Sequence, residues 1–186
     1  DVITTDTNEV VSFEDLGGAM TQASKSGVSH YTADSDDAAI QLARDLCDMF
    51  PSNNMDRAPV RKTSDSPDRI CDALDNMIPE DTNKPYDVTD VVREVLDDGG
   101  FLEVQADYAM NIVCGFGHLA GHTVGVVANL PNVLAGCLDI DASDKAARFV
   151  RFCDAFNIPI LTFEDVPGFL PGTNQEWGGI IRHGAK

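Results

Sequence analysis

The second half of the sequence predicts an α/β fold built in layers. Apolar runs rich in Val, Ile and Phe are typical of buried strands, whereas apolar residues at helical spacing indicate amphipathic helices. Both patterns alternate along this half, which indicates one sheet covered by helices. The expected strands lie at 101–104, 112–119, 123–128 and from Pro159 onward, and the expected helices at 142–157 and from Thr173 onward.

Helices are also expected in the first hundred residues. Segments 13–25 and 36–50 show helical spacing, a short helix is expected near 67–77, and another covers 88–96. The three prolines between 51 and 67 interrupt any apolar period and mark a linker or domain boundary. The expected apolar face of the second helix comprises Ile40, Ala43, Leu46, Cys47 and Phe50.

Local signals refine the second half. Ala120 and Gly121 lie between two strands and predict a tight hairpin turn. The strand that starts at Pro159 is expected to be buried. The acids at the start of the expected helix 142–157 suit the positive end of its dipole, and they are Asp139, Asp141 and Asp144. The apolar side expected for that helix comprises Ala142, Ala146, Phe149, Val150, Cys153 and Phe156.

Composition excludes several classes of protein. The 186 residues include 31 acids and 13 Lys or Arg, a net charge of −18, and 43% are hydrophobic, which is enough to bury the core of one or two domains. No stretch approaches the roughly 20 apolar residues that span a bilayer. The negative charge makes nucleic acid and membrane surfaces poor partners. The cysteines form no C-x-x-C pair and are expected to be reduced core thiols of a cytoplasmic protein: Cys47, Cys71, Cys114, Cys137 and Cys153.

The acidic residues are unevenly distributed. Residues 1–98 carry 22 acids and 8 bases, net −14, while residues 99–186 carry 9 and 5, net −4. Such a chain repels itself, and molar salt would screen that repulsion within about 3 Å. One hypothesis is a halophilic source, and the alternative is an ordinary acidic surface. Because the chain begins with Asp1 and ends inside an expected helix, a piece of a longer protein is expected.

Two patterns around the hairpin resemble known sites without their context. Gly115-Phe-Gly117-His-Leu-Ala120 matches the dinucleotide fingerprint, but a strand pattern follows where a phosphate-binding helix is needed. Hairpin glycines are the favoured interpretation. His118 and His122 are four apart, as zinc ligands are on a helix, but the segment has the pattern of two strands and does not favour a metal site.

Other chemistry-bearing motifs are also weak. The run from Asp139 to Asp144 starts like a calcium loop, but it lacks the glycine and the final glutamate, so helix capping is favoured. No G-x-S-x-G nucleophile turn occurs. These residues therefore indicate neither covalent catalysis nor a metal mechanism.

The loop from Asp165 to Gly172, DVPGFLPG, is the most informative segment. It follows a strand and precedes a helix, and ligands of open α/β folds bind at that position. Its glycines permit close backbone approach, its prolines restrict the loop, and the helix start offers free N–H groups. A plain strand-to-helix connection is the alternative.

Three long runs give the sequence a family resemblance. They are residues 16–30 (LGGAMTQASKSGVSH), 85–160, which include GFGHLAGHTVGVVANLPNVLAGCLDIDASDKAARF, and 165–186 (DVPGFLPGTNQEWGGIIRHGAK). The chain resembles the carboxyltransferase (beta) subunit of biotin-dependent acyl-CoA carboxylases, of the propionyl-CoA carboxylase beta type, together with related transcarboxylases and decarboxylases. The resemblance covers nearly the whole chain, and its later motifs are highly specific.

The resemblance implies a crotonase-like layered fold of the ClpP/crotonase superfamily. Residues 1–62 are expected to be the C-terminal part of the family's N-domain, and residues 63–186 the N-terminal part of its C-domain. In the family, carboxybiotin and acyl-CoA meet where the N-domain of one subunit faces the C-domain of another. A homo-hexamer with a biotin carboxylase and biotin carrier partner is therefore expected for the intact protein.

The implied activity is carboxyl transfer from carboxybiotin to the α carbon of a short-chain acyl-CoA, propionyl-CoA first. In the family, the biotin itself removes the α proton and backbone amides hold two oxyanions, so no catalytic side chain and no metal are expected here. The biotin pocket is expected at Phe169, whose carbonyl would accept from the ureido nitrogen, with Gly168 and Val166. The acyl-CoA contacts are expected at Gly115, Phe116, Gly117, His118 and Gly121.

Some residues depart from the family pattern. His118 and His122 replace the usual Arg, which weakens the case for phosphate contacts from this hairpin. Leu130 replaces a usual Gln, and Gln22 a usual His. Asp165 and Glu176 could order the loop or stay solvated.

The family's two oxyanion motifs lie outside the 186 residues, so this chain alone is expected to be inactive. The alternatives are a biotin-dependent acyl-CoA decarboxylase subunit and a non-catalytic structural or binding module. Co-purification with a soluble biotin carboxylase would favour the carboxylase, whereas a biotinylated membrane complex would favour the decarboxylase.

Overall fold

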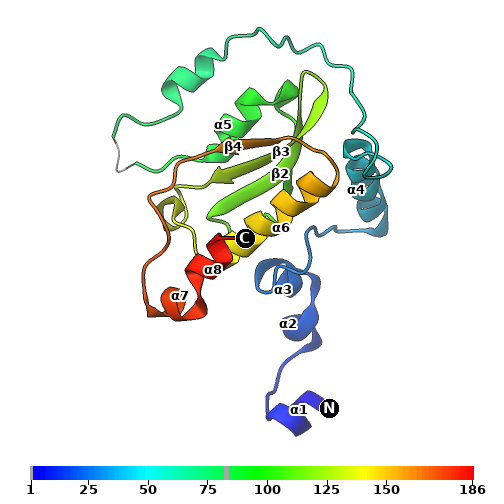
Figure 1. The fold of residues 1–186 in the computed structure, drawn as a ribbon. Coiled ribbons are helices and arrows are strands. Elements are labelled where there is room, and N and C mark those ends of the chain that lie inside the picture. The colour runs from blue at the N-terminus through cyan, green and yellow to red at the C-terminus, as the bar shows by residue number, and fades with distance from the viewer. Residues whose placement is uncertain (1, 82–83) are drawn as a thin grey trace.

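The computed structural model describes residues 2–81 and 84–186, and a four-stranded sheet of order β1-β2-β3-β4 forms its centre (Figure 1). The strands are β1 Phe101–Val104, β2 Ile112–Leu119, β3 His122–Asn129 and β4 Ile160–Phe163. The α-helices are α1 Val2–Thr7, α2 Phe13–Gly17, α3 Ala19–Ser24, α4 Asp36–Met49, α5 Val88–Val95, α6 Ile140–Ala155, α7 Thr173–Gly178 and α8 Ile180–Gly184. Short 3-10 helices are η1 Asp72–Asn76, η2 Asp97–Gly99 and η3 Leu134–Gly136.

The sheet is mixed. β2 pairs antiparallel with both β1 and β3, whereas β4 pairs parallel with β3. Ala120 and Gly121 form the predicted hairpin turn, with φ values of 49° and 78° that suit a two-residue connection. β1 and β2 have the predicted bounds, and β3 is one residue longer at each end than the predicted strand. The layered α/β fold is therefore confirmed.

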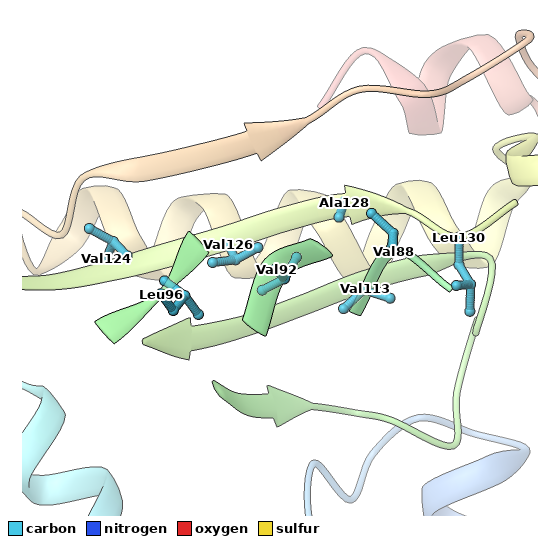
Figure 2. Close-up of a cluster of buried hydrophobic side chains, with 8 residues drawn as sticks. All are labelled: Val88, Val92, Leu96, Val113, Val124, Val126, Ala128 and Leu130. Atoms are coloured by element: carbon cyan, nitrogen blue, oxygen red, sulfur yellow. The ribbon is translucent and has the colours of Figure 1, made fainter. Parts of the chain in front are cut away.

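Helix α5 covers one face of the sheet. Every second residue of β3 points to this face, as the two-residue period of a strand requires, and the helical spacing of α5 brings its apolar stripe onto them. Val92 and Leu96 are fully buried there. The cluster consists of Val88, Val92, Leu96, Val113, Val124, Val126, Ala128 and Leu130 (Figure 2).

Helix α6 covers the opposite face. The residues of β2 that alternate with those of the α5 side point to it, and Phe50 after α4 adds a ring 4.9 Å from the Phe116 ring. A Cβ on Gly125 would lie 2.6 Å from the Cys153 sulfur, so the missing side chain lets α6 approach β3. The cluster consists of Val104, Ile112, Cys114, Phe116, Ala142, Phe149, Cys153 and Ile158.

A buried lysine holds the loop that receives the N-terminal segment. Helices α1 to α3 extend away from the sheet (Figure 1), and the chain after them joins the β1–β2 loop, where Gln105 Nε2 donates to the Gly27 carbonyl at 2.5 Å. Lys145 of α6 is 2% exposed and donates to the carbonyls of Gln105 at 2.9 Å and Tyr108 at 2.7 Å. Burial lowers the pKa of Lys145.

Glycines divide two of the predicted helices. The expected helix 13–25 splits into α2 and α3 because Gly18 is extended, with φ −62° and ψ 161°. The expected helix from Thr173 splits into α7 and α8 because Gly179 adopts the left-handed region at φ 86°. The short helix expected near 67–77 is a single 3-10 segment, η1.

Several predictions of burial are wrong. No residue of α4 is buried, Ile40 is 51% exposed, and Cys47 is exposed rather than a core thiol. Val150 is 40% exposed on α6. Ile160 is 38% exposed because β4 is an edge strand of this sheet, with a neighbour on one side. Among the described residues, no helix is both long and apolar enough to cross a membrane.

Candidate functional site

Two loops meet at one edge of the sheet and form the candidate site. Because β3 and β4 are parallel, their carboxyl ends reach the same edge, which is the position where ligands of open α/β folds bind. The loop after β3, residues 130–138, and the loop after β4, residues 164–172, leave from that edge. The parallel pairing therefore explains why two segments so far apart in sequence lie together.

Asn129 ties the two loops to each other. It is the last residue of β3 and is 6% exposed. Its Nδ2 donates to the carbonyl of Gly136 at 3.3 Å, and its Oδ1 accepts from the backbone N–H of Asp165 at 3.4 Å. One buried amide thus satisfies a backbone group of each loop.

Tyr86 secures the start of the second loop from outside. Its hydroxyl donates to Asp165 Oδ2 at 2.8 Å. Burial, together with this hydrogen bond and the carboxylate charge, raises the pKa of Tyr86 to about 12. Asp165 therefore has an ordering contact, whereas Glu176 is exposed in the first turn of α7.

The backbone carbonyl of Phe169 is free to accept a hydrogen bond. A parallel bridge joins Leu138 to Phe169, and it uses the neighbours of Phe169: Leu138 N–H donates to Gly168 O at 3.1 Å and Leu170 N–H donates to Leu138 O at 2.8 Å. In such a bridge the N–H and C=O of the middle residue point to the other side. Within the described residues no hydrogen bond uses the Phe169 carbonyl. Phe169 as a whole residue is 41% exposed.

Gly168 has a backbone conformation that other residues rarely adopt. Its φ is 144°, and a Cβ built there would meet no atom within 4 Å. Glycine is thus required by the backbone angle and not by crowding. The open space beside Gly168 leaves room for a ligand next to the Phe169 carbonyl.

An open pocket of about 670 Å³ adjoins the loop. Val166 and Pro167 of the loop line it together with Tyr86 and Pro131. Ala135, which also lines the pocket, has φ 52°, a strained conformation for a residue with a Cβ. Strain of this kind collects where a site must hold a fixed shape.

The glycines predicted to contact acyl-CoA have packing roles in β2. A Cβ on Gly115 would lie 2.5 Å from the Phe101 ring, and one on Gly117 would lie 2.5 Å from Leu96 Cδ1. Phe116 is 3% exposed and belongs to the cluster beneath α6. Within the described residues, other parts of the chain therefore pack against all three positions. Their contact with a coenzyme stays a prediction.

Asp97 and Arg61 engage the hairpin turn. The Asp97 carboxylate accepts from the N–H groups of Ala120 at 2.9 Å and Gly121 at 2.7 Å, and Arg61 N–H donates to Gly121 O at 2.8 Å. A Cβ on Gly121 would overlap the Arg61 carbonyl. The turn glycine is therefore needed by the fold itself.

His118 lies at the edge of a second open pocket, of about 760 Å³, beside η2 and the segment around Arg61. Burial and the nearby Arg61 charge lower the pKa of His118, so the ring is neutral at pH 7. Three His, Cys, Asp or Glu side chains that could share a metal ion are not found together within residues 2–81 and 84–186.

The dinucleotide interpretation does not fit the structure. Gly115 and Gly117 lie inside β2, and β3 follows the turn where a phosphate-binding helix would be needed. The favoured interpretation as hairpin glycines is confirmed. Helix capping by Asp139 is also confirmed, since its carboxylate accepts from the N–H of Ala142 at 2.9 Å.

The structure brings the expected biotin residues together but separates them from the expected acyl-CoA residues. Val166, Gly168 and Phe169 lie in the loop after β4. Gly121 lies in the β2–β3 turn at the opposite end of the sheet, and Gly115 and Phe116 lie in β2 between the two ends. The eight residues of β3 between the two ends span about 25 Å. Within this chain the two groups do not form one site.

Sequence reasoning missed the contacts that shape the site. Asn129 does carry a signal in the sequence, because it is a polar residue that ends an apolar strand pattern. Tyr86 carries no such signal, because its partner Asp165 is 79 residues away. The left-handed residues Leu134 and Ala135 are also invisible in the sequence, since neither residue type favours that conformation.

Comparisons with known proteins agree with this arrangement. The family described as "Carboxyl transferase domain" matches residues 1–186. The methylmalonyl-CoA decarboxylase subunit alpha of Veillonella parvula is 56% identical over 185 residues. The carboxyltransferase subunit of propionyl-CoA carboxylase from Haloferax mediterranei is 56% identical over 186 residues. Each alignment covers 100% of this chain and 36% of the relative, so the chain spans about a third of their length.

A solved structure shares the fold. The crystal structure of transcarboxylase 12S, described as a hexamer with hydrolysed methylmalonyl-coenzyme A bound, superposes with a TM-score of 0.95 and 48% identity. The match covers 99% of this chain and 36% of the transcarboxylase chain. The expected crotonase-like fold is thereby confirmed.

Proposed function

Since this chain belongs to the carboxyl transferase domain family, we propose that it works within a biotin-dependent enzyme that transfers a carboxyl group from carboxybiotin to the α carbon of propionyl-CoA or a similar short acyl-CoA. The observation that carries the proposal is the Phe169 carbonyl, which accepts no hydrogen bond from the described residues and lies on a loop whose shape other contacts maintain. A ureido N–H needs such an acceptor.

The residues present fit biotin. Gly168 leaves open space beside the carbonyl, and the bridge from Leu138 holds the loop while leaving that carbonyl unused. When bound, biotin supplies the group that carries and delivers the carboxyl unit. The chain's own contribution is to accept the ureido N–H at Phe169 O and so to set the orientation of the ring.

We place the acyl-CoA contacts at the other end of the sheet, around His118 and Gly121 beside the pocket near Arg61. Since about 25 Å separates the two ends, the reaction needs a second copy or the remainder of the protein to bring the substrates together. Residues 1–62 and 63–186 are accordingly parts of two related domains in this proposal. The hexamer of the transcarboxylase 12S neighbour supports assembly of that kind.

The proposed partners are a biotin carboxylase and a biotin carrier, and a cytoplasmic location is proposed with them. The propionyl-CoA carboxylase relative supports this choice because its name describes it as the carboxyltransferase subunit of such an enzyme. The decarboxylase is the second candidate, and the Veillonella relative, which is also 56% identical, supports it.

Carboxyl transfer measured with the intact protein tests the proposal. Purified protein is given carboxybiotin with propionyl-CoA or acetyl-CoA, and the 186-residue chain is assayed alongside. We expect activity in the intact protein, faster with propionyl-CoA, and none in the chain alone. Intact protein that transfers no carboxyl group to either substrate would contradict the carboxylase and favour the decarboxylase. Activity of the chain alone would contradict the view that essential oxyanion amides lie outside it.

A further inference from the structure

One carboxylate joins helices α6 and α8. Asp144 of α6 lies between two side chains of the last segment: its Oδ2 is 2.8 Å from Nδ1 of His183, and its Oδ1 is 2.7 Å from Nζ of Lys186. We call these three residues the α6–α8 clasp. Burial raises the pKa of Asp144, but the hydrogen bonds from His183 and Lys186 outweigh it and hold the pKa below 3.8.

The clasp residue His183 is next in sequence to Gly184, the residue against which the Phe169 ring packs. Gly184 follows His183 in α8, and a Cβ on Gly184 would overlap the Phe169 ring. Any contact that fixes His183 also fixes Gly184, because the two are consecutive in a helix. The position of the Phe169 ring against α8 therefore depends on the clasp.

Other contacts tie the same helices to the start of α6. The side chain of Gln175 in α7 accepts from the N–H of Ile140 at 2.9 Å, and Gly178 leaves room for the Ile140 side chain. Leu138, two residues before α6, makes the bridge to Phe169. The segment at the start of α6 thus contacts the backbone of the Phe169 loop directly, through Leu138. It contacts the Phe169 ring indirectly, through α7 and α8.

We propose that Asp144 is a positioning residue for the Phe169 carbonyl. It fixes α8 through His183, and α8 sets the place of the Phe169 ring through Gly184. The inference rests on the proposed function, because the carbonyl position affects the reaction only if that carbonyl binds biotin. It deepens that proposal by predicting an effect on biotin alone, since the expected acyl-CoA residues lie at the opposite end of the sheet.

Steady-state kinetics of the intact protein test this inference. The assay is the reverse reaction, in which methylmalonyl-CoA gives its carboxyl group to free biotin and becomes propionyl-CoA. For Asp144→Ala we expect the KM for biotin to rise about tenfold, because the Phe169 carbonyl would no longer be held in line with the ureido N–H. The KM for methylmalonyl-CoA should stay unchanged. Asp154→Ala is the matched control, an exposed aspartate of the same helix.

A second variant separates positioning from simple stabilisation. Gly184→Ala keeps the clasp but pushes on the Phe169 ring, so it should also raise the KM for biotin and leave the KM for methylmalonyl-CoA unchanged. If thermal unfolding shows that Asp144→Ala does not fold, the KM values of Gly184→Ala test the inference instead.

Three results would overturn the inference. The first is an unchanged KM for biotin in variants of an active wild type, and the second is an equal rise in both KM values. Either of these leaves the proposed function standing. The third is a wild-type protein that carboxylates no biotin, which overturns the proposed function and the inference with it.

Discussion

At the scale of single residues, the candidate biotin site is made of backbone and not of acids or bases. The Phe169 carbonyl would be the acceptor whatever side chain stood there, and its direction depends on the bridge to Leu138. The residue whose identity matters most is Gly168, because its φ of 144° disfavours any side chain. A site of this type has no titratable group that a sequence motif could reveal.

Replacement of Gly168 should therefore impair biotin use. In Gly168→Ala the loop must leave its φ of 144° or bear strain of about 1–3 kcal/mol, so the Phe169 carbonyl shifts. We expect the KM for biotin to rise about tenfold or more, measured with the intact protein. Gly17→Ala is the control, since a Cβ there would meet only Gln22 Nε2, at 3.7 Å. An unaltered KM for biotin in Gly168→Ala would argue against this loop as the biotin site.

At the scale of elements, side chains distant in sequence complete the helix ends. The last carbonyls of α5 have no partner within the helix, and the guanidinium of Arg69 donates hydrogen bonds to them. Its Nη2 donates to the carbonyl of Glu94 at 2.6 Å and to that of Leu96 at 3.3 Å, while its Nε is 2.6 Å from Asp65. Asp65 of the predicted linker and Arg69 just after it thereby hold the end of α5.

Loss of Arg69 should destabilise the fold. Arg69→Ala removes the guanidinium N–H groups that donate to the carbonyls at the end of α5, and we expect a loss of about 1–3 kcal/mol in the free energy of unfolding. Urea unfolding followed by circular dichroism measures it. Arg57→Ala, at an exposed position of the preceding linker, should change the free energy by less than about 0.5 kcal/mol. Equal effects of the two substitutions would show that the Arg69 contacts contribute nothing specific.

The clasp between α6 and α8 predicts a pH dependence of stability. The pKa of Asp144 is lowered in the folded state, so between that pKa and 3.8 the unfolded chain binds more protons and stability rises with pH. The contribution is complete above about pH 4 and is lost as pH falls through the folded pKa. Unfolding of wild type and Asp144→Asn between pH 3 and 6 should therefore show a stability difference that shrinks toward pH 3. A difference that grows on acidification would refute this role of Asp144.

At the scale of the whole molecule, charge dominates. A net charge of −18 on 186 residues is self-repelling, and residues 1–98, which extend through α5, carry −14 of it. We propose adaptation to high salt, as the excess of Asp and the five lysines suggest. The Debye length falls to about 3 Å at 1 M salt, which is shorter than most distances between surface charges.

The melting temperature should therefore rise with salt. Between 0.1 and 3 M KCl we expect an increase of at least about 5 °C, which corresponds to roughly 1–2 kcal/mol for a chain of this size. Sucrose serves as the control, because it stabilises by exclusion from the surface without screening charge. A melting temperature in dilute buffer equal to that in molar salt would end the halophilic hypothesis.

The sequence by itself determined where the strands lie, where most of the helices lie and where the hairpin turns. β1 and β2 have the predicted bounds because runs rich in Val, Ile and Phe and the Ala120-Gly121 turn are local signals. The sequence motifs also identified the family, which the comparisons confirm. The same motifs pointed to the loop at Phe169. These features depend on neighbours in sequence.

Only the tertiary structure decided what each segment lies against. Ile160 is exposed because β4 is an edge strand, Asn129 joins two loops, and the biotin and acyl-CoA candidates occupy opposite ends of one sheet. Periodicity records that a face is apolar but not which partner covers it. A contact such as that of Tyr86 with Asp165 depends on the path of the 79 residues between them, and packing of the whole chain determines that path.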